Sequence, residues 1–174
     1  MIGSNDNTKQ IIQNLINENK IQIKYYFQEN QGKMLAINKI CELTTGDVII
    51  DCDSDDYFTK DALKIIKEEF ENTRKEGLYG ICFLKQNQDG KIDGTSFQGV
   101  VSTMFDLYFK QATKGEKVLV YYSDVRKKYK HELENNEKFI TEARMYHKID
   151  ENYKIKCVNK PVQIGDYRKD RLYK

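Results

Sequence analysis

The chain has 174 residues, enough for one folded domain with a proper hydrophobic core. Lys and Arg number 29 against 27 Asp and Glu, interspersed along the chain, so the basic footprint of a nucleic-acid-binding domain is absent and no nucleic-acid partner is predicted. No stretch approaches the roughly 18 consecutive apolar residues of a membrane span, so no transmembrane segment is expected.

The first third of the chain predicts helices alternating with strands. Residues 6–18 carry apolar side chains at helical spacing, and residues 21–27 alternate and are rich in β-forming side chains. A second helix is expected to begin at Gly32. The short apolar run 47–51 is typical of a strand that is buried on both faces.

The same alternation continues toward the carboxyl terminus. A helix is expected from Thr59, a candidate cap, to about Arg74, followed by a strand over 79–85. A helix over 102–111 and a strand over 117–122 come next. Alternation of this kind predicts an α/β fold with a mixed, mainly parallel central sheet flanked by helices.

The run Asp53-Ser54-Asp55-Asp56 directly follows the predicted buried strand. Ligands of open α/β sheets usually bind in the crevice beyond the carboxyl ends of strands. Mg²⁺ and Mn²⁺ prefer carboxylate oxygens and commonly take substrate phosphates as further ligands. Asp53 and Asp55 are therefore candidate ligands of a metal-bound diphosphate. The alternative is a solvated acidic loop that caps the next helix.

Two other kinds of acidic site can be compared with the same residues. A calcium-binding EF-hand loop beginning at Asp51 fails, because its sixth position is Asp56 instead of Gly and its twelfth is Ala62 instead of Glu. A phosphatase of the haloacid dehalogenase type would use Asp51 and Asp53 as nucleophile and acid/base. It remains an alternative, although its motif normally lies on the first strand of the domain.

Two segments resemble the core of family 2 glycosyltransferases. Residues 32–38 are similar to Gly-x-x-x-Ala-Arg-Asn, and residues 46–56 are similar to Gly-Glu-Tyr-Ile followed by Asp-Ser-Asp-Asp, at the separation usual in the family. Segments 114–121, 137–142 and 159–162 resemble the later half of one branch. The resemblance therefore covers nearly the whole chain.

This resemblance implies a domain of the GT-A type over residues 1–174. Residues 1–75 would form the nucleotide-sugar-binding part and residues 76–174 the acceptor-side part. The implied activity is inverting, metal-dependent transfer of a sugar from a nucleotide-diphosphate sugar to a hydroxyl of a glycan or lipid-linked acceptor. The implied metal is Mn²⁺ or Mg²⁺.

The resemblance also assigns site residues. Asp53 and Asp55 would hold the metal, with Asp53, Lys33 and Asn38 in the donor site. Glu142 would be the general base, because a carboxylate can take the proton from an attacking sugar hydroxyl. The alternative for Glu142 is a surface or ion-paired helix residue.

Two positions depart from the family pattern. Ile37 stands where the family has Arg, with Lys33 as the nearest cationic substitute. Residues 3–8 resemble the family's Asp-Asp-Gly-Ser turn, but Met1-Ile2 stands in place of the two aspartates. The resemblance thus implies an amino-terminally incomplete domain that lacks the first strand, and a non-catalytic binding or structural remnant is a further alternative. An unpaired sheet edge would favour a homo-oligomer.

The remaining polar candidates are sparse. The four cysteines are widely scattered without a Cys-x-x-Cys pair, which favours reduced thiols over a zinc cage or a disulfide framework. A cytoplasmic location is expected, with the inner face of the membrane as a further candidate. His131 and His147 are candidates to complete a metal site, and a surface or hydrogen-bonded role is the alternative.

Overall fold

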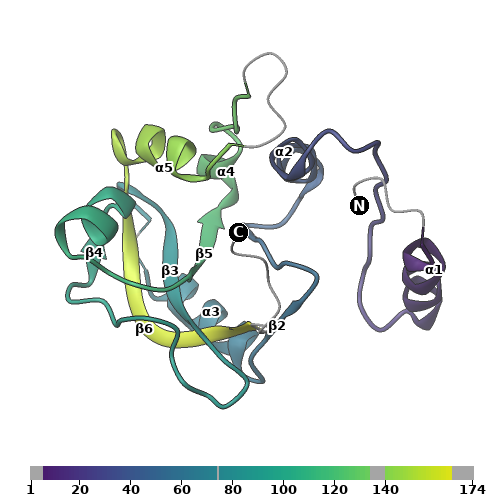
Figure 1. The fold of residues 1–174 in the computed structure, drawn as a ribbon, viewed down its shortest axis with the longest axis horizontal. Coiled ribbons are helices and arrows are strands. Elements are labelled where there is room, and N and C mark those ends of the chain that lie inside the picture. The colour runs from purple at the N-terminus through teal and green to yellow at the C-terminus, as the bar shows by residue number, and fades with distance from the viewer. Residues whose placement is uncertain (1–5, 74, 134–139, 166–174) are drawn as a thin grey trace, which may run out of the picture.

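The computed structural model describes residues 6–73, 75–133 and 140–165, which form a mixed α/β fold around one sheet (Figure 1). The strands are β1 Val48–Ile50, β2 Asp56–Phe58, β3 Leu78–Gln86, β4 Val101–Ser102, β5 Lys117–Tyr122 and β6 Lys154–Gly165. The helices are α1 Thr8–Glu18, α2 Lys33–Leu43, α3 Ala62–Glu71, the wide turn η1 Asp106–Lys110, α4 Ser123–Arg126 and α5 Ala143–Asp150.

The sheet has the order β1-β5-β3-β6-β2, with β4 paired to β6. The predicted mixed α/β class is confirmed, but the prediction of a mainly parallel sheet is wrong. Among the described strands β3 and β6 form the one parallel pair, and the other four pairings are antiparallel. Helices between strands predict parallel crossovers. Strand β5, however, lies antiparallel to β3, and an antiparallel neighbour can be reached without a crossover helix.

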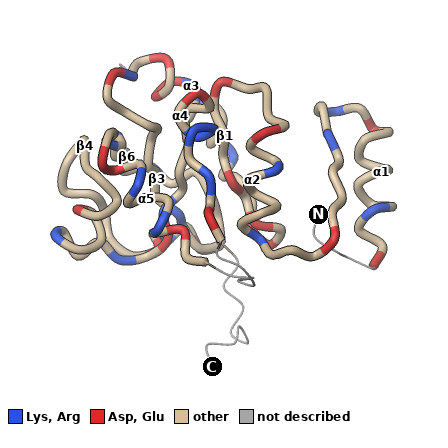
Figure 2. Tube along the Cα trace, turned by 90° about the horizontal axis from the view of Figure 1, so that it is seen from above, with Lys and Arg blue, Asp and Glu red and all other residues tan. Residues whose placement is uncertain are grey.

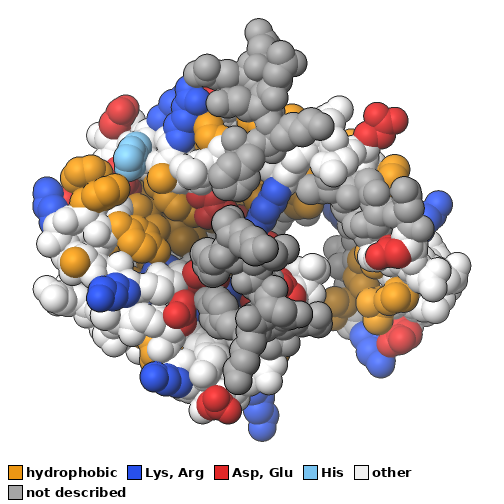
Figure 3. Space-filling model, viewed as in Figure 1, with side chains coloured by type: hydrophobic (Ala, Val, Ile, Leu, Met, Phe, Trp, Pro, Cys, Tyr) orange, Lys and Arg blue, Asp and Glu red, His pale blue; other side chains and the backbone are white. Residues whose placement is uncertain are grey.

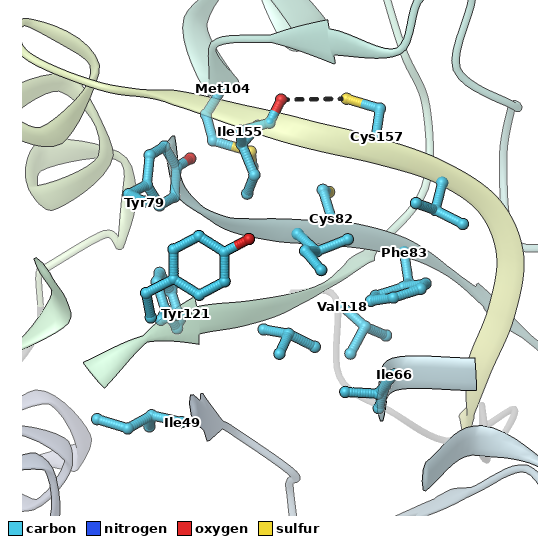
Figure 4. Close-up of a cluster of buried hydrophobic side chains, with 14 of the residues drawn as sticks. Ile49, Ile66, Tyr79, Cys82, Phe83, Met104, Val118, Tyr121, Ile155 and Cys157 are labelled. Carbon is cyan, nitrogen blue, oxygen red and sulfur yellow. Dashed lines mark hydrogen bonds between the residues drawn. The ribbon is translucent and has the colours of Figure 1, made fainter. Parts of the chain in front are cut away.

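Strand β3 lies in the middle of the sheet, and its seven inner residues are buried. Figure 4 shows its side chains packed with those of β5 and β6, with Ile66 of α3 on one side. The ring of Tyr79 stacks on Tyr121 of β5 at a centroid distance of 6.2 Å. A near-continuous apolar strand is what burial on both faces requires.

The sheet is curled, and the acidic run spans its two edges. Strands β1 and β2 lie at opposite ends of the strand order, which in a flat sheet would separate them by about 19 Å. They are joined by residues 51–55 alone, and a turn shortens this link because the Asp56 N–H donates to the Asp53 carbonyl at 3.0 Å. The edges therefore have to approach each other. Strand β6 bends to allow this, pairing first with β3 and β4 and at its end with β2.

Most predicted elements are present. The helices over 6–18 and from Gly32, and the strands over 47–51, 79–85 and 117–122, are confirmed with small differences in their bounds. The helix expected to begin at Thr59 begins at Ala62 instead, and the Thr59 carbonyl, not its side chain, accepts the Ala62 N–H.

The predicted strand over residues 21–27 is wrong. These residues form no strand, and Ile21 and Phe27 are 71% and 50% exposed. Together with α1, which buries none of its residues, they lie apart from the sheet (Figure 1). Alternation of side chains favours a strand only where a neighbouring strand supplies hydrogen bonds and a covered face.

Charges of both signs are interspersed along the whole chain (Figure 2). Within residues 6–73, 75–133 and 140–165, no helix is long and apolar enough to cross a membrane. The four cysteines are free thiols, three of them buried. The Gly-Ser-Asn turn expected at residues 3–5 lies outside the described residues.

The close approach of β3 and β5 gives a first prediction. A Cβ at Gly80 would lie 2.2 Å from the Val120 carbonyl oxygen, so Gly80→Ala must push the two strands apart. We expect the free energy of unfolding, measured by urea denaturation, to fall by about 2–3 kcal/mol. Gly99→Ala is the control, because its Cβ would meet nothing closer than 4.0 Å and should cost little. Equal stability of the two variants would contradict the tight β3–β5 contact.

Candidate active site

A cleft of about 260 Å³ opens where the acidic run crosses between the sheet edges. Its polar lining comes from α2, the segment after β1, β3, β5 and the start of α5, so segments distant in sequence converge on it. Acidic and basic side chains gather near the centre of the face drawn in Figure 3. The charged residues that line the cleft include Lys33, Asp51, Asp53, Lys85 and Glu142.

Lys33 and Asp53 form an ion pair in this cleft. Gly32, with a φ of 94° that favours glycine, turns the chain into α2 and places Lys33 at its first position. The Lys33 Nζ lies 2.8 Å and 3.0 Å from the two carboxylate oxygens of Asp53. Both side chains are about half exposed, so the pair adds little to stability and each partner remains open to a ligand.

The pKa of Lys33 reflects several carboxylates around it. Desolvation alone would lower this pKa, but the hydrogen bond and charge of Asp53, with the charges of Glu142 and Asp51, outweigh it and raise the pKa. Lys33 therefore stays cationic at neutral pH. The carboxylates of Asp51, Asp53 and Glu142 all lie close enough to stabilise its positive charge.

Asp51 and Glu142 face the same cleft from two different elements. Desolvation raises the pKa of Asp51, with Arg126 opposing and Glu142 adding to the increase. Its backbone carbonyl accepts a hydrogen bond from the Gln163 side chain at 2.8 Å, which ties the acidic run to β6. Glu142 accepts a hydrogen bond from the Tyr146 hydroxyl at 2.7 Å, one turn further along α5.

Tyr146 holds Glu142 as a neutral hydrogen-bond donor. Burial raises the pKa of Tyr146 well above its ordinary value, and the Glu142 carboxylate acts in the same direction. The phenol therefore keeps its proton throughout the physiological range. A carboxylate held by one neutral donor retains lone pairs that can accept a proton from a substrate hydroxyl.

Asn38 is placed elsewhere. Its amide nitrogen donates to the His131 carbonyl at 2.8 Å, and its amide oxygen accepts from the His131 N–H at 2.9 Å. Asn38 does not line the cleft, so the structure shows it anchoring the segment after α4 to α2. Asp55 is half-buried and also does not line the cleft. The structure thus brings together Lys33, Asp53 and Glu142 from the predicted set.

The two histidines lie away from the acidic run. His131 is buried beside Asn38, and His147 is exposed against Phe105, with a ring-centroid distance of 5.7 Å. Within the described parts of the chain, no group of three His, Cys, Asp or Glu residues is arranged to hold a metal ion. A divalent cation at the acidic run could take a carboxylate of the protein as one ligand and phosphate and water as others. Hard cations such as Mg²⁺ commonly bind in this way, and the exposed Asp53 carboxylate fits that role.

A second charged group in the cleft, centred on Lys85, was not predicted from the sequence. Lys85, at the end of β3, donates hydrogen bonds of 2.6 Å each to Asp56 of β2 and to Glu116 next to β5. The available signal was a lysine near the end of an otherwise apolar strand. The hydrogen bond of Tyr146 to Glu142 and the place of Gln163 in the cleft were not predicted, because nothing local in the sequence marks a side chain that reaches a cleft from a distant element.

The architecture is that of a GT-A glycosyltransferase. The fold is similar to that of S. aureus TarS residues 1–349, solved in complex with UDP-GlcNAc, with a TM-score of 0.65 and 20% identity over 97% of this chain and 48% of that chain. The structure of TarS 1–349 solved without a named ligand gives a TM-score of 0.63 over 93% of this chain.

The chain belongs to glycosyl transferase family 2, whose sequence profile matches residues 3–142. It is 33% identical over 97 residues to an uncharacterized glycosyltransferase of Nostoc sp., covering 56% of this chain and 30% of that protein. It is 35% identical over 89 residues to one from Haemophilus influenzae, covering 49% of this chain and 36% of that protein. The chain thus spans about a third of the length of these relatives. Membership of this family sets aside the phosphatase alternative built on Asp51 and Asp53.

The buried histidine gives a prediction on pH. Burial and the Arg126 charge lower the pKa of His131 to about 4, against 6.5 in the unfolded chain. The unfolded state therefore binds more protons between these values, and the free energy of unfolding should fall by about 2–3 kcal/mol as pH drops from 6.5 to 4.

His131→Asn should remove this part of the pH dependence, measured by urea denaturation at several pH values. His147→Asn is the control, because His147 is exposed on α5. An unchanged pH profile in His131→Asn would show that protonation of His131 does not destabilise the fold.

Proposed function

We propose that this chain transfers a sugar from a nucleotide-diphosphate sugar to a hydroxyl of a glycan or lipid-linked acceptor. The observation that carries the proposal is the convergence of Lys33, Asp53 and Glu142, from α2, the acidic run and α5, on one cleft. Family membership and the likeness to a fold solved with UDP-GlcNAc support a nucleotide-sugar donor.

The donor diphosphate would bind at the acidic run. Asp53, with Asp55 from the same turn, would hold Mn²⁺ or Mg²⁺, which when bound neutralises charge on the departing diphosphate. Lys33 would move from Asp53 to a phosphate oxygen as the diphosphate enters, because its exposed pair is easily exchanged. Asn38 would support the donor site indirectly, by fixing the segment after α4 against the helix that carries Lys33.

The acceptor hydroxyl would be activated by Glu142. Tyr146 orients this carboxylate through its hydrogen bond of 2.7 Å. Direct attack of the activated hydroxyl on the anomeric carbon inverts its configuration. Residues 137–139 of the family-like segment before Glu142 lie outside the described residues.

A second candidate function is donor binding without turnover. It would use the same donor site, with Lys33 and Asp53, and would give Glu142 no part in transfer. We also propose a homo-oligomer. Strand β1 ends the strand order, so one edge of the sheet has no partner strand among the described residues and could pair with a second copy. A cytoplasmic location, at the inner face of the membrane where the acceptor is lipid-linked, completes the proposal.

Donor binding can be tested on the acidic run. We expect Asp53→Asn to weaken Mn²⁺-dependent binding of UDP, measured by isothermal titration, by about tenfold or more, because a metal ligand and the partner of Lys33 are lost together. Asp55→Asn should weaken it to a smaller extent, whereas Asp51→Asn should retain it. Asp89→Asn, in an exposed turn, is the matched control. Equal affinity in the wild type and Asp53→Asn would remove Asp53 from the donor site.

The role of Glu142 calls for separate readouts of binding and transfer. Glu142→Gln keeps the size of the side chain and its hydrogen bond with Tyr146 but removes the basic oxygen. We expect transfer from UDP-GlcNAc to fall by about 10²–10⁴-fold, with UDP affinity within a factor of about two. Glu132→Gln is the control, because it replaces a carboxylate by an amide in the same way at an exposed position outside the cleft. Unchanged transfer would leave the base unassigned, and UDP binding by a wild type that transfers no sugar would favour the binding module.

A further inference from the structure

Lys85 is the most enclosed cation of the cleft. It is 6% exposed and lies near the end of the central strand β3. Its Nζ bonds Asp56 and Glu116 at 2.6 Å each, and these partners come from the two strands β2 and β5 and their flanks. One ammonium thus connects three elements at the place where the acidic run crosses the curled sheet.

The ammonium remains charged in this position. Burial alone would lower the pKa of Lys85, but the hydrogen bonds and charges of Asp56 and Glu116 outweigh burial and raise it. A buried ion pair is costly to break, because removal of one partner leaves a charge without compensation. The arrangement is therefore stable, unlike the exchangeable pair of Lys33 and Asp53.

The backbones of Glu116 and Asp56 are held by different hydrogen bonds. The Glu116 N–H donates to the Asp93 side chain at 2.7 Å, beside the tight contact of Gly94 with the Lys114 carbonyl. Asp56 instead closes the turn of the acidic run, because its N–H donates to the Asp53 carbonyl at 3.0 Å. Lys85 therefore links Glu116 to Asp56, and through Asp56 it restrains the turn that carries Asp53.

We propose that Lys85 is a positioning residue that fixes the turn of residues 53–56 for binding of the donor diphosphate. It acts through Asp56, whose carboxylate is committed to Lys85, and leaves the Asp53 carboxylate directed to the cleft. This proposal rests on the proposed donor binding at Asp53. It goes beyond it by assigning a role to a residue outside the acidic motif.

The chain offers a matched control for loss of a partly buried ion pair. Lys156 of β6 pairs with Glu69 of α3 at 2.9 Å, with both side chains 18% exposed. It belongs to the same sheet but does not line the cleft. Lys156→Met should therefore lower thermal stability through the same kind of loss, without effect on the acidic run.

The test compares Lys85→Met, Lys156→Met and the wild-type chain. We expect Lys85→Met to weaken Mn²⁺-dependent UDP binding by about tenfold or more, and Lys156→Met to bind within about a factor of two of wild type. Asp56→Ala should weaken binding to a similar extent. The double variant of Lys85 and Asp56 should be no weaker than either single variant, because both act through one contact. Wild-type affinity in folded Lys85→Met, or an equal loss in Lys156→Met, would overturn the proposal.

Hydrogen exchange separates this proposal from the proposed function. Peptides covering residues 51–58 should exchange faster in Lys85→Met than in wild type and be unchanged in Lys156→Met, whether or not UDP binds. Absence of UDP binding by the wild type would count against the donor site, whereas unchanged exchange over 51–58 would overturn the role of Lys85.

If Lys85→Met does not fold, Glu116→Gln takes its place, because the Glu116 side chain is 56% exposed and can be altered at lower cost. It should show the same two effects in weaker form, and wild-type exchange and UDP affinity in Glu116→Gln would overturn the proposal.

Discussion

The short link between β1 and β2 constrains the rest of the structure. The two strands lie at opposite ends of the strand order, yet residues 51–55 join them and contain a turn. The sheet must curl until its edges nearly meet, and β6 bends to follow it. The acidic run therefore crosses between the edges, with Asp53 open to solvent and Asp56 shielded. The position of the cleft is a consequence of chain connectivity.

Close packing in the middle of the sheet supports this curl. Strand β3 contacts β5 so tightly at Gly80 that no side chain fits, and its buried residues fill both faces. A strand of this kind has to leave the core at some point, and it does so at Lys85. A cation at that position is stable because two carboxylates neutralise it. Lys85 thus lies where the core meets the cleft, and a change there affects both stability and the acidic run.

Local patterns predicted the elements whose formation depends on local periodicity. Apolar spacing identified α2 and β1, and the acidic run after β1 contributes Asp53 and Asp56 to the cleft. Strand β2 and strand β6 were missed, since each is defined by pairing with segments far along the chain. Residues 21–27 show the converse, because their alternation is real but none of the strands in the described ranges pairs with them. Asn38 was placed in the donor site by its motif, whereas its amide is engaged by the distant His131 backbone.

The two lysines of the cleft divide the acidic run into an exchangeable part and a fixed part. Lys33 and Asp53 are about half exposed, so water and ions compete with their pairing. Lys85 and Asp56 are shielded, with side chains 7% and 10% exposed, so their contact is not readily exchanged. A site that binds an anionic ligand with a metal needs both properties: a carboxylate that can change partners and a backbone that does not move when it does. Asp53 and Asp56 are only three positions apart in the sequence, and the difference between them comes from which lysine the fold brings to each.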